Sequence, residues 1–227
     1  MKSEGNIDGM ENKSTAGFQV NIGDVTMDFM TEAEVFSPNG ADRGTLAMLS
    51  VVKLEEQDKL LDLGCGYGLV GIWAAKQIGA EQVVMCDIFE TAVKVARGNC
   101  ERNGVEVAVF RSDGLKDLPQ ELRFTKILSN PPYHEDFSVP KCFIELGYKR
   151  LSLGGVMYMV TKRKDWYYNK LKTVFGGVRV DEIDGYYVFT AEKRERKPVE
   201  KKKNEQTMSK KLQRKMSKKK QIHNKKV

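Results

Sequence analysis

The segment Asn130-Pro131-Pro132-Tyr133 contains residue types suited to chemistry at an amino nitrogen. The Asn130 side-chain oxygen and the Pro131 carbonyl can each accept one N–H of a planar NH2 group, and both prolines stiffen the backbone that aims these acceptors. Tyr133 offers an aromatic face on which a flat ring can stack. Two such acceptors localise the nitrogen lone pair and stabilise the positive charge that develops there during transfer. We therefore predict that Asn130, Pro131, Pro132 and Tyr133 form a catalytic centre acting on an exocyclic amine or an amide.

The segment Asp62-Leu63-Gly64-Cys65-Gly66-Tyr67-Gly68 is typical of a ligand-binding loop, because glycines allow a ligand to approach the backbone closely. Asp62 precedes the glycines, where its carboxylate can meet a cationic amino group. Asp87 follows about 20 residues later in the sequence, at the end of the next expected strand. A carboxylate at this position can accept hydrogen bonds from ribose hydroxyls. The stretch 66–71 also fits the G-x-G-x-x-G fingerprint of dinucleotide sites, so a nicotinamide cofactor is an alternative. S-adenosylmethionine is favoured because Asp62 would repel a pyrophosphate, and because of the downstream Asn-Pro-Pro-Tyr.

These two groups can act together only if the fold brings them to one edge of a sheet. Strands are expected over 59–63, 82–86, 105–110, 126–129, 155–160, 178–183 and 186–191, and helices over 42–53, 69–78, 90–103, 140–151 and 166–175. This alternation predicts βαβ units, a mostly parallel sheet and one antiparallel hairpin at its end, with Asp184-Gly185 as the turn. Residues 18–22 and 25–29 predict an additional N-terminal hairpin that turns at Gly23-Asp24.

The charge of the chain is unevenly distributed. The 227 residues have a net charge of +7, but residues 193–227 alone contain 16 Lys and Arg against three Glu. Such a tail buries too little apolar surface to fold by itself, and its natural partner is a polyanion such as RNA. We expect a disordered segment over 1–16, one α/β domain over 17–192, and a basic, disordered tail over 193–227.

The composition argues against several other classes of protein. No apolar run approaches the length of about 18 residues that spans a membrane, and the N-terminus lacks the apolar region of a signal peptide. None of the four cysteines has C-x-x-C spacing, so neither a zinc site nor any other metal site is expected. We expect a cytoplasmic protein with reduced thiols.

The combination of Asp-x-Gly-x-Gly-x-Gly, a strand-end Asp and Asn-Pro-Pro-Tyr resembles class I methyltransferases that modify planar amino nitrogens. More narrowly, the segment Phe36-Ser37-Pro38-Asn39-Gly40-Ala41-Asp42-Arg43-Gly44-Thr45 resembles the small methyltransferase family, which includes bacterial enzymes that methylate guanine N2 in ribosomal RNA. The resemblance covers about residues 18–192. It implies a Rossmann-like class I fold, a mostly parallel seven-stranded sheet with helices on both faces, and S-adenosylmethionine as the cofactor.

The resemblance also assigns roles to individual residues. Asp113 would meet the adenine amino group, and Phe36 to Asn39 would flank the cofactor and target pocket. The full set expected to bind the cofactor is Phe36, Asp62, Gly64, Cys65, Gly66, Gly68, Asp87, Ile88, Asp113 and Asn130. The residues expected to contact the RNA substrate are Pro38 and Asn39 and, because they follow a strand at the ligand-binding edge rather than from the resemblance, Lys162, Arg163 and Lys164. Methyl transfer does not require a general base, so His134 is interpreted as a bystander or a substrate contact.

The substrate that the resemblance implies is guanine N2 in ribosomal RNA, in free RNA or in a ribosomal particle. Methylation of adenine N6 in RNA or DNA, or of a glutamine amide in a protein, uses the same amino-group chemistry and remains an alternative. The protein-glutamine enzymes usually have a helical N-terminal domain. A protein of another class, a non-catalytic RNA-binding assembly factor with this fold, is a more distant alternative.

Overall fold

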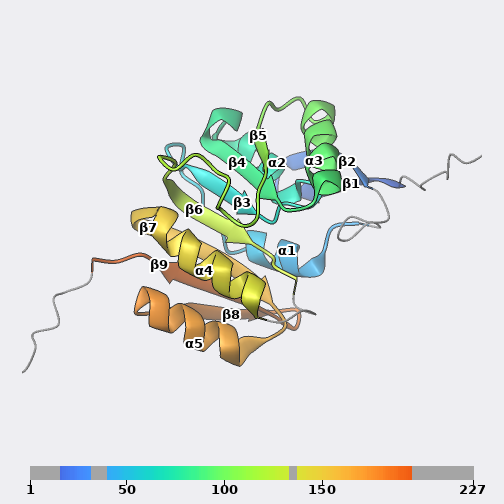
Figure 1. The fold of residues 1–227 in the computed structure, drawn as a ribbon. Coiled ribbons are helices and arrows are strands. Elements are labelled where there is room, and N and C mark those ends of the chain that lie inside the picture. Colours follow the sequence, from blue (N-terminus) through green and yellow to red (C-terminus); the bar gives the residue numbers. More distant parts are fainter. Residues whose placement is uncertain (1–15, 32–39, 133–136, 196–227) are drawn as a thin grey trace, which may run out of the picture. The chain divides into compact units, whose positions relative to one another are not determined.

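The computed structural model describes residues 16–31, 40–132 and 137–195 (Figure 1), and the chain forms one compact unit up to Arg194. The strands are β1 (Ala16–Ile22), β2 (Val25–Thr31), β3 (Leu60–Leu63), β4 (Val83–Asp87), β5 (Ala108–Arg111), β6 (Phe124–Ser129), β7 (Leu151–Thr161), β8 (Arg179–Ile183) and β9 (Tyr186–Glu192). The helices are α1 (Arg43–Leu49), α2 (Leu69–Ile78), the short 3-10 helix η1 (Ala80–Gln82), α3 (Glu90–Arg102), α4 (Ser138–Arg150) and α5 (Lys164–Phe175). Nearly all of the predicted N-terminal segment and basic tail lies outside the described residues, so these domain boundaries stay predictions.

Seven strands form one sheet in the order β5-β4-β3-β6-β7-β9-β8, and β1 and β2 form a separate hairpin. The first five of these seven strands are parallel to one another, whereas β9 is antiparallel to both β7 and β8. The chain moves outward from β3 to β5, and then returns to the other side of β3 to form β6 and β7. This confirms the predicted fold and places the change of winding direction between β3 and β6.

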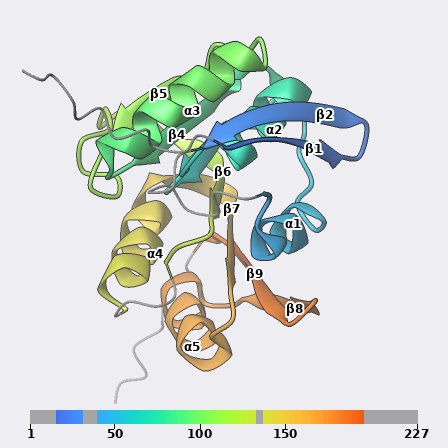
Figure 2. The same ribbon diagram turned by 90° about the vertical axis from the view of Figure 1, so that its right-hand side faces the viewer.

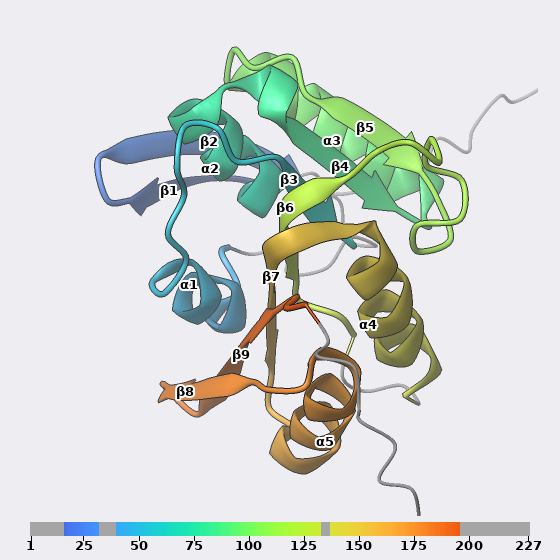
Figure 3. The same ribbon diagram turned by 90° about the vertical axis from the view of Figure 1, so that its left-hand side faces the viewer.

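Helices cover both faces of the sheet because side chains alternate between the faces along each strand. Leu60 packs in one apolar cluster with residues of α1, α2 and α3, whereas Leu61 and Leu63 pack in a second cluster with residues of α4 and α5. Figure 3 shows α1 and the β1–β2 hairpin on one side of the sheet, and α4 and α5 on the other. Asp62 lies between Leu61 and Leu63 in β3, so its side chain points to the opposite face of the sheet, where its carboxylate meets α2.

Several element boundaries differ from the predicted ones. Helix α1 ends at Leu49 rather than residue 53, because Ser50 caps it and donates its hydroxyl to the Ala47 carbonyl at 2.8 Å. Strand β7 begins at Leu151, four residues earlier than predicted, because Leu151 pairs with Phe124 ahead of an irregularity in the register. None of the described helices is long and apolar enough to cross a membrane.

Asn99 of α3 and Asn103, which caps the C-terminus of this helix, hold the edge of the N-terminal hairpin. Asn99 accepts from the Met30 N–H at 2.8 Å and donates to the Met30 carbonyl at 2.9 Å. Asn103, one helical turn later, makes the same pair of bonds with Asp28 at 3.0 and 2.7 Å. The two side chains therefore take the place of a neighbouring strand along β2, which lies against α2 and α3 in Figure 2.

Candidate active site

A cavity of about 460 Å³ opens at the carboxyl edge of the sheet, where the winding direction changes between β3 and β6. Its walls come from the segments that follow β3, β4, β5 and β6, together with the start of α1 and part of α4. Open α/β sheets bind their ligands at such a switch point. This cavity is therefore the candidate active site, and it brings together the two groups of residues singled out in the sequence.

The loop after β3 presents its backbone to the cavity. The N–H groups of Gly64 and Cys65 both donate to the Cys86 carbonyl, at 2.9 and 3.0 Å, which ties the loop to the end of β4. Gly66 has a φ of 56°, and a Cβ at this position would meet no atom within 4 Å. The backbone at Gly66 therefore borders open space, where a ligand can lie directly against the main chain.

Asp62 is a buried carboxylate in the wall of this cavity, and only 3% of its surface is exposed. Its Oδ2 accepts a hydrogen bond of 2.9 Å from the Gly71 N–H, in the first turn of α2. Burial raises the pKa of Asp62 to about 7, although the bond from Gly71 acts in the opposite direction. The carboxylate thus occupies the positive end of α2, the position that a phosphate group would need.

Asp87, at the end of β4, connects the glycine loop to the next wall of the cavity. Its Oδ2 accepts from the Gly66 N–H at 2.9 Å, and its Oδ1 accepts from the Phe89 N–H at 3.1 Å. Ile88 and Phe89 follow and also line the cavity, although 49% and 68% of their respective surfaces are exposed. These apolar side chains form an open rim beside a fixed carboxylate, an arrangement suited to a flat ring attached to a sugar.

Asp113 lies in the loop after β5 and forms an ion pair with Lys116 at the surface. Arg150 of α4, which is 7% exposed, holds the same loop in place. The Arg150 guanidinium donates to the backbone carbonyls of Leu115, Leu118, Pro119 and Leu122, at distances from 2.6 to 3.3 Å. This buried cation fixes the path of the loop and hence the position of Asp113.

Asn130 follows β6 and lines the cavity; β6 and β4, which ends at Asp87, lie on either side of β3. Its Nδ2 donates to Asp42 Oδ2 at 2.8 Å and to Thr45 Oγ1 at 3.0 Å. Because both partners act as acceptors here, the amide nitrogen must point toward them. Among the described residues no hydrogen bond reaches Asn130 Oδ1, so no described group competes with a ligand for this oxygen. Pro131 and Pro132 continue the same wall.

Three consecutive cations follow β7 at the same edge of the sheet. Lys162 Nζ lies 4.9 Å from the ring centroid of Tyr186, and Lys164 Nζ lies 5.1 Å from that of Tyr187. The Arg163 guanidinium lies 5.2 Å from the Phe137 ring. None of the three forms an ion pair with a carboxylate in the described part of the chain, so their charges are held by neutral rings and are not compensated.

Comparison with known proteins identifies the family. Residues 26–190 match the family model of the methyltransferase small domain. This chain belongs to the methyltransferase small domain family. The *Bacillus subtilis* uncharacterized protein YbxB is 30% identical over 188 residues, which are 80% of this chain and 92% of YbxB. The ribosomal RNA small subunit methyltransferase C of *Shewanella amazonensis* is 34% identical over 166 residues, 70% of this chain and 48% of that protein.

A solved structure supports the same assignment of fold. The *Thermus thermophilus* 16S rRNA N2 G1207 methyltransferase (RsmC), in complex with AdoMet and guanosine, aligns with a TM-score of 0.74 and 26% identity. The alignment covers 84% of this chain and 53% of that one. This chain therefore spans about half the length of the ribosomal RNA methyltransferases that it matches, and most of YbxB. The predicted family and class I fold are confirmed.

Most of the predicted site residues of this family member meet in the cavity. Those that line it are Asp62, Gly64, Cys65, Gly66, Asp87, Ile88, Asp113, Asn130, Pro131 and Pro132. Gly68 is not in the described lining; it caps α2 with a φ of 94°, and a Cβ at this position would lie 3.4 Å from the Ala96 Cβ. Lys162, Arg163 and Lys164 lie at the same edge but outside the lining. Phe36, Pro38, Asn39, Tyr133 and His134 lie outside the described residues, so their roles stay predictions.

The sequence reasoning missed other residues of the lining. Asp42, Thr45 and Phe89 line the cavity, but only the first two carried a signal in the sequence: Asp-x-x-Thr at the start of a helix-like stretch is typical of a capping residue. That signal predicts the bond from the Thr45 N–H to Asp42, observed at 2.8 Å. It does not reveal the contact with Asn130, which is 88 residues away in the sequence.

The charge of the cavity distinguishes between the two cofactors left open by the sequence. Its described lining includes Asp42, Asp62, Asp87 and Asp113, and no Lys, Arg or His. A dinucleotide carries a negative pyrophosphate, for which this lining has no positive partner, and Asp62 already occupies the N-terminus of α2. The lining instead suits a ligand with positive charge. The described residues contain no cluster of three or more His, Cys, Asp or Glu that could hold a metal ion.

Proposed function

We propose that this chain is an S-adenosylmethionine-dependent N-methyltransferase whose substrate is an exocyclic amino group of a base, with guanine N2 of ribosomal RNA as the target. One observation carries this proposal: Asn130 lines an acidic cavity at the switch point of the sheet, with its amide NH2 bonded to Asp42 and Thr45 and no described residue bonded to its oxygen. A hydrogen-bond acceptor fixed at that position suits an NH2 substrate and a cationic methyl donor.

The residues present fit S-adenosylmethionine. The methionine part of the cofactor would lie along Gly64, Cys65 and Gly66, with its ammonium group near the Asp62 carboxylate. Asp87 would accept from the ribose hydroxyls, and Ile88 and Asp113 would contact the adenine ring and its amino group. Cys65 serves as a small side chain here, because burial raises the pKa of its thiol and keeps it protonated.

When bound, S-adenosylmethionine supplies an electrophilic methyl group attached to a sulfonium. Asn130 Oδ1 and the Pro131 carbonyl would each accept one N–H of the target amine, which aims the nitrogen lone pair at the methyl group. These acceptors are fixed before the reaction and stabilise the positive charge that grows on nitrogen. The alkylated nitrogen is acidic and releases its proton to solvent, so no strong general base is required. Tyr133 would provide the stacking face for the base.

A nucleic-acid substrate is supported by the names of the relatives and by charge. Lys162, Arg163 and Lys164 lie at the edge of the sheet that holds Asn130, and cations without carboxylate partners suit a phosphodiester backbone. The predicted basic tail, 193–227, would add affinity that does not depend on sequence. Removing residues 193–227 should weaken RNA binding and reduce its salt dependence; an unchanged affinity would contradict the role of the tail.

The four cysteines are free thiols, three of them buried, which is consistent with the cytoplasmic location that we propose. The decisive experiment is methyl transfer from labelled S-adenosylmethionine to ribosomal RNA, DNA and protein fractions in parallel, followed by nucleoside analysis. We expect N2-methylguanosine in the RNA fraction. Label found as N6-methyladenine or on glutamine would support an alternative substrate.

Two further alternatives have their own test. Calorimetric titration should show binding of S-adenosylhomocysteine and none of NADH. Failure of S-adenosylhomocysteine to bind would favour a non-catalytic RNA-binding assembly protein, and binding of NADH would favour an oxidoreductase.

A further inference from the structure

Asp42 makes contacts that its place at the start of α1 does not require. As the capping residue of this helix, it needs only the bond that its Oδ2 accepts from the Thr45 N–H at 2.8 Å. The same oxygen also accepts from Asn130 Nδ2 at 2.8 Å, and from the Thr45 hydroxyl at 3.4 Å. One carboxylate oxygen therefore connects the N-terminus of α1 to the residue proposed to hold the target amine.

We propose that Asp42 is a positioning residue that selects the reactive orientation of the Asn130 amide, an inference that rests on the function proposed above. An asparagine side chain has two orientations, which exchange its oxygen and its NH2 group. In the orientation observed here, no described residue hydrogen-bonds to the oxygen, which can accept from a substrate amine. In the reversed orientation, two NH2 groups would oppose each other in the cavity, and two oxygens would oppose each other at Asp42.

The carboxylate decides the orientation because it cannot donate. A hydroxyl or an amide at position 42 could turn to present a proton, but an ionised Asp42 only accepts hydrogen bonds. It also orients Thr45: because the Thr45 hydroxyl can donate to Asp42 Oδ2, its lone pairs are left to accept from Asn130. Both partners of the amide nitrogen are thus set by one charged group.

The same charge strengthens Asn130 as an acceptor. A carboxylate bonded to the amide NH2 polarises the amide and moves electron density toward its oxygen, and such chains of hydrogen bonds reinforce one another. The Asn130 oxygen then interacts more strongly with an amine whose nitrogen becomes positive than with the neutral amine before transfer. Asp42 should therefore affect the rate of transfer more than the binding of either substrate.

Substitution separates this role from helix capping. Serine caps a helix as well as aspartate does, but its shorter side chain does not reach Asn130. We expect Asp42→Ser to lower kcat by about tenfold to a hundredfold, with the Tm and the Kd of S-adenosylhomocysteine close to those of the wild type. Asp42→Asn keeps both the cap and the length but loses the charge, and it should lower kcat by an intermediate factor. Thr45→Val removes only the hydroxyl and should have the smallest effect.

A double-mutant cycle with Asn130→Ala tests whether Asp42 acts through Asn130. Labelled methyl transfer is measured under single-turnover conditions for the wild type, Asp42→Ser, Asn130→Ala and the double variant. We expect Asp42→Ser to cause no further loss once Asn130 is Ala. A wild-type kcat for Asp42→Ser, or an equal loss in both backgrounds, would overturn the inference while leaving the proposed function in place. Full activity of Asn130→Ala would instead overturn the proposed mechanism and, with it, this role of Asp42.

Discussion

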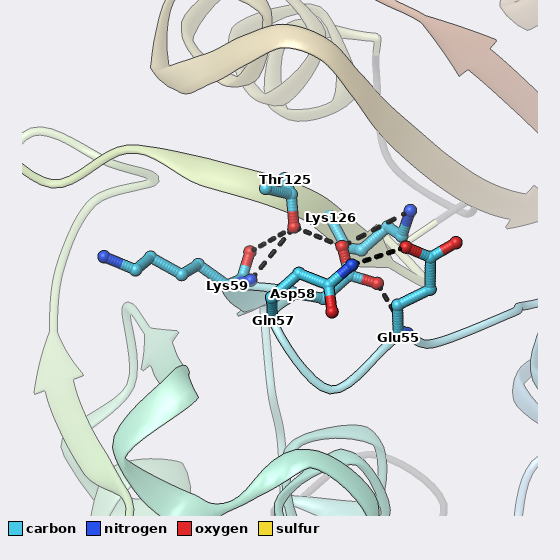
Figure 4. A network of polar contacts seen from close by, with 6 residues as sticks. All are labelled: Glu55, Gln57, Asp58, Lys59, Thr125 and Lys126. Atoms are coloured by element: carbon cyan, nitrogen blue, oxygen red, sulfur yellow. Dashed lines mark hydrogen bonds and ion pairs between the residues drawn. The ribbon is translucent and has the colours of Figure 1, made fainter.

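Two buried carboxylates at opposite edges of the central sheet, Asp58 and Asp62, differ in how far the protein itself satisfies them. At the amino edge, Asp58 accepts from the Thr125 hydroxyl at 2.6 Å and from the Glu55 N–H at 2.9 Å, and it forms an ion pair with Lys126 at 3.5 Å. Figure 4 shows that this network links the residues at the start of β3 to those at the start of β6. At the carboxyl edge of the same two strands, Asp62 accepts one backbone N–H, and the Asn130 oxygen accepts no hydrogen bond from any described residue.

The difference shows how one sheet divides stability and function between its ends. Asp58 has a cation and several hydrogen-bond donors beside it, so the protein itself compensates its charge. Asp62 has a single donor, so it favours any ligand that brings positive charge. Both edges connect β3 to β6, and the cavity described above lies at the edge with the less satisfied groups. The predictions below test this division, beginning with the largest expected effect.

Asp62→Asn should stabilise the free protein at pH 8. Burial raises the pKa of Asp62 to about 7 from its ordinary value of 3.8, so between these pH values the unfolded chain loses a proton that the folded protein keeps. The free energy of unfolding of the wild type should therefore fall as the pH rises from about 4 to about 7, by at most about 4 kcal/mol from this group. Urea denaturation of both proteins across this range measures the difference, and equal pH profiles would contradict it.

The same substitution should weaken cofactor binding. A cationic ligand favours the ionised form of Asp62, so the affinity of the wild type for S-adenosylmethionine should increase from pH 6 to pH 8. The affinity of the variant should change little over this range. Calorimetry at both pH values tests this point, and a parallel increase in the two proteins would show that the ammonium group does not lie near Asp62.

Asp58→Ala should have the opposite effect on stability, lowering the free energy of unfolding by about 3 kcal/mol, because it leaves Lys126 and the Thr125 hydroxyl without their partner. Binding of S-adenosylhomocysteine, measured well below the Tm, should not change. Asp24→Ala, in the exposed hairpin turn, is the matched control and should change stability by less than about 0.5 kcal/mol. A loss of cofactor binding in Asp58→Ala would show that the two edges are not independent.

Replacing Lys162, Arg163 and Lys164 together by Gln should reduce RNA affinity by about tenfold or more. It should also reduce the slope of log K against log salt by about 2, because each phosphate contact on a single strand contributes roughly 0.7. Lys172 of α5 lies 5.4 Å from the Tyr168 ring, in the last turn of the same helix that Lys164 begins. Lys172→Gln is therefore the control, and its slope should stay close to that of the wild type. Equal effects per charge would indicate a general response to net charge.

The smallest expected effect separates Asn99 from Asn103. Both side chains hold β2, but Asn99 Nδ2 also donates to the Tyr67 carbonyl of the glycine loop at 2.9 Å. Asn99→Ala should therefore raise the Kd of S-adenosylhomocysteine by about fivefold, or roughly 1 kcal/mol, whereas Asn103→Ala should raise it less than twofold. Equal changes would mean that the hairpin affects the cofactor loop through its docking alone.

The sequence by itself determined the elements and the class of chemistry. Glycine spacing, strand-end carboxylates and the rigid Asn-Pro-Pro segment are local patterns, because backbone freedom and stiffness depend on neighbouring residues. The alternation of apolar runs with helical stretches was sufficient to predict a parallel sheet, and a parallel sheet brings the ends of its strands to one edge.

Only the tertiary structure decided how the polar groups at that edge are paired. Asp42 and Asn130 come from segments 88 residues apart, and the bond between them exists because α1 and the end of β6 meet beside the same cavity. The pairing of Asn99 with β2 and with Tyr67, and the burial that raises the pKa of Asp62, likewise depend on packing between distant segments. The direction of a hydrogen bond and the loss of solvent around a charge are properties of three-dimensional contact, which residue spacing along the chain does not specify.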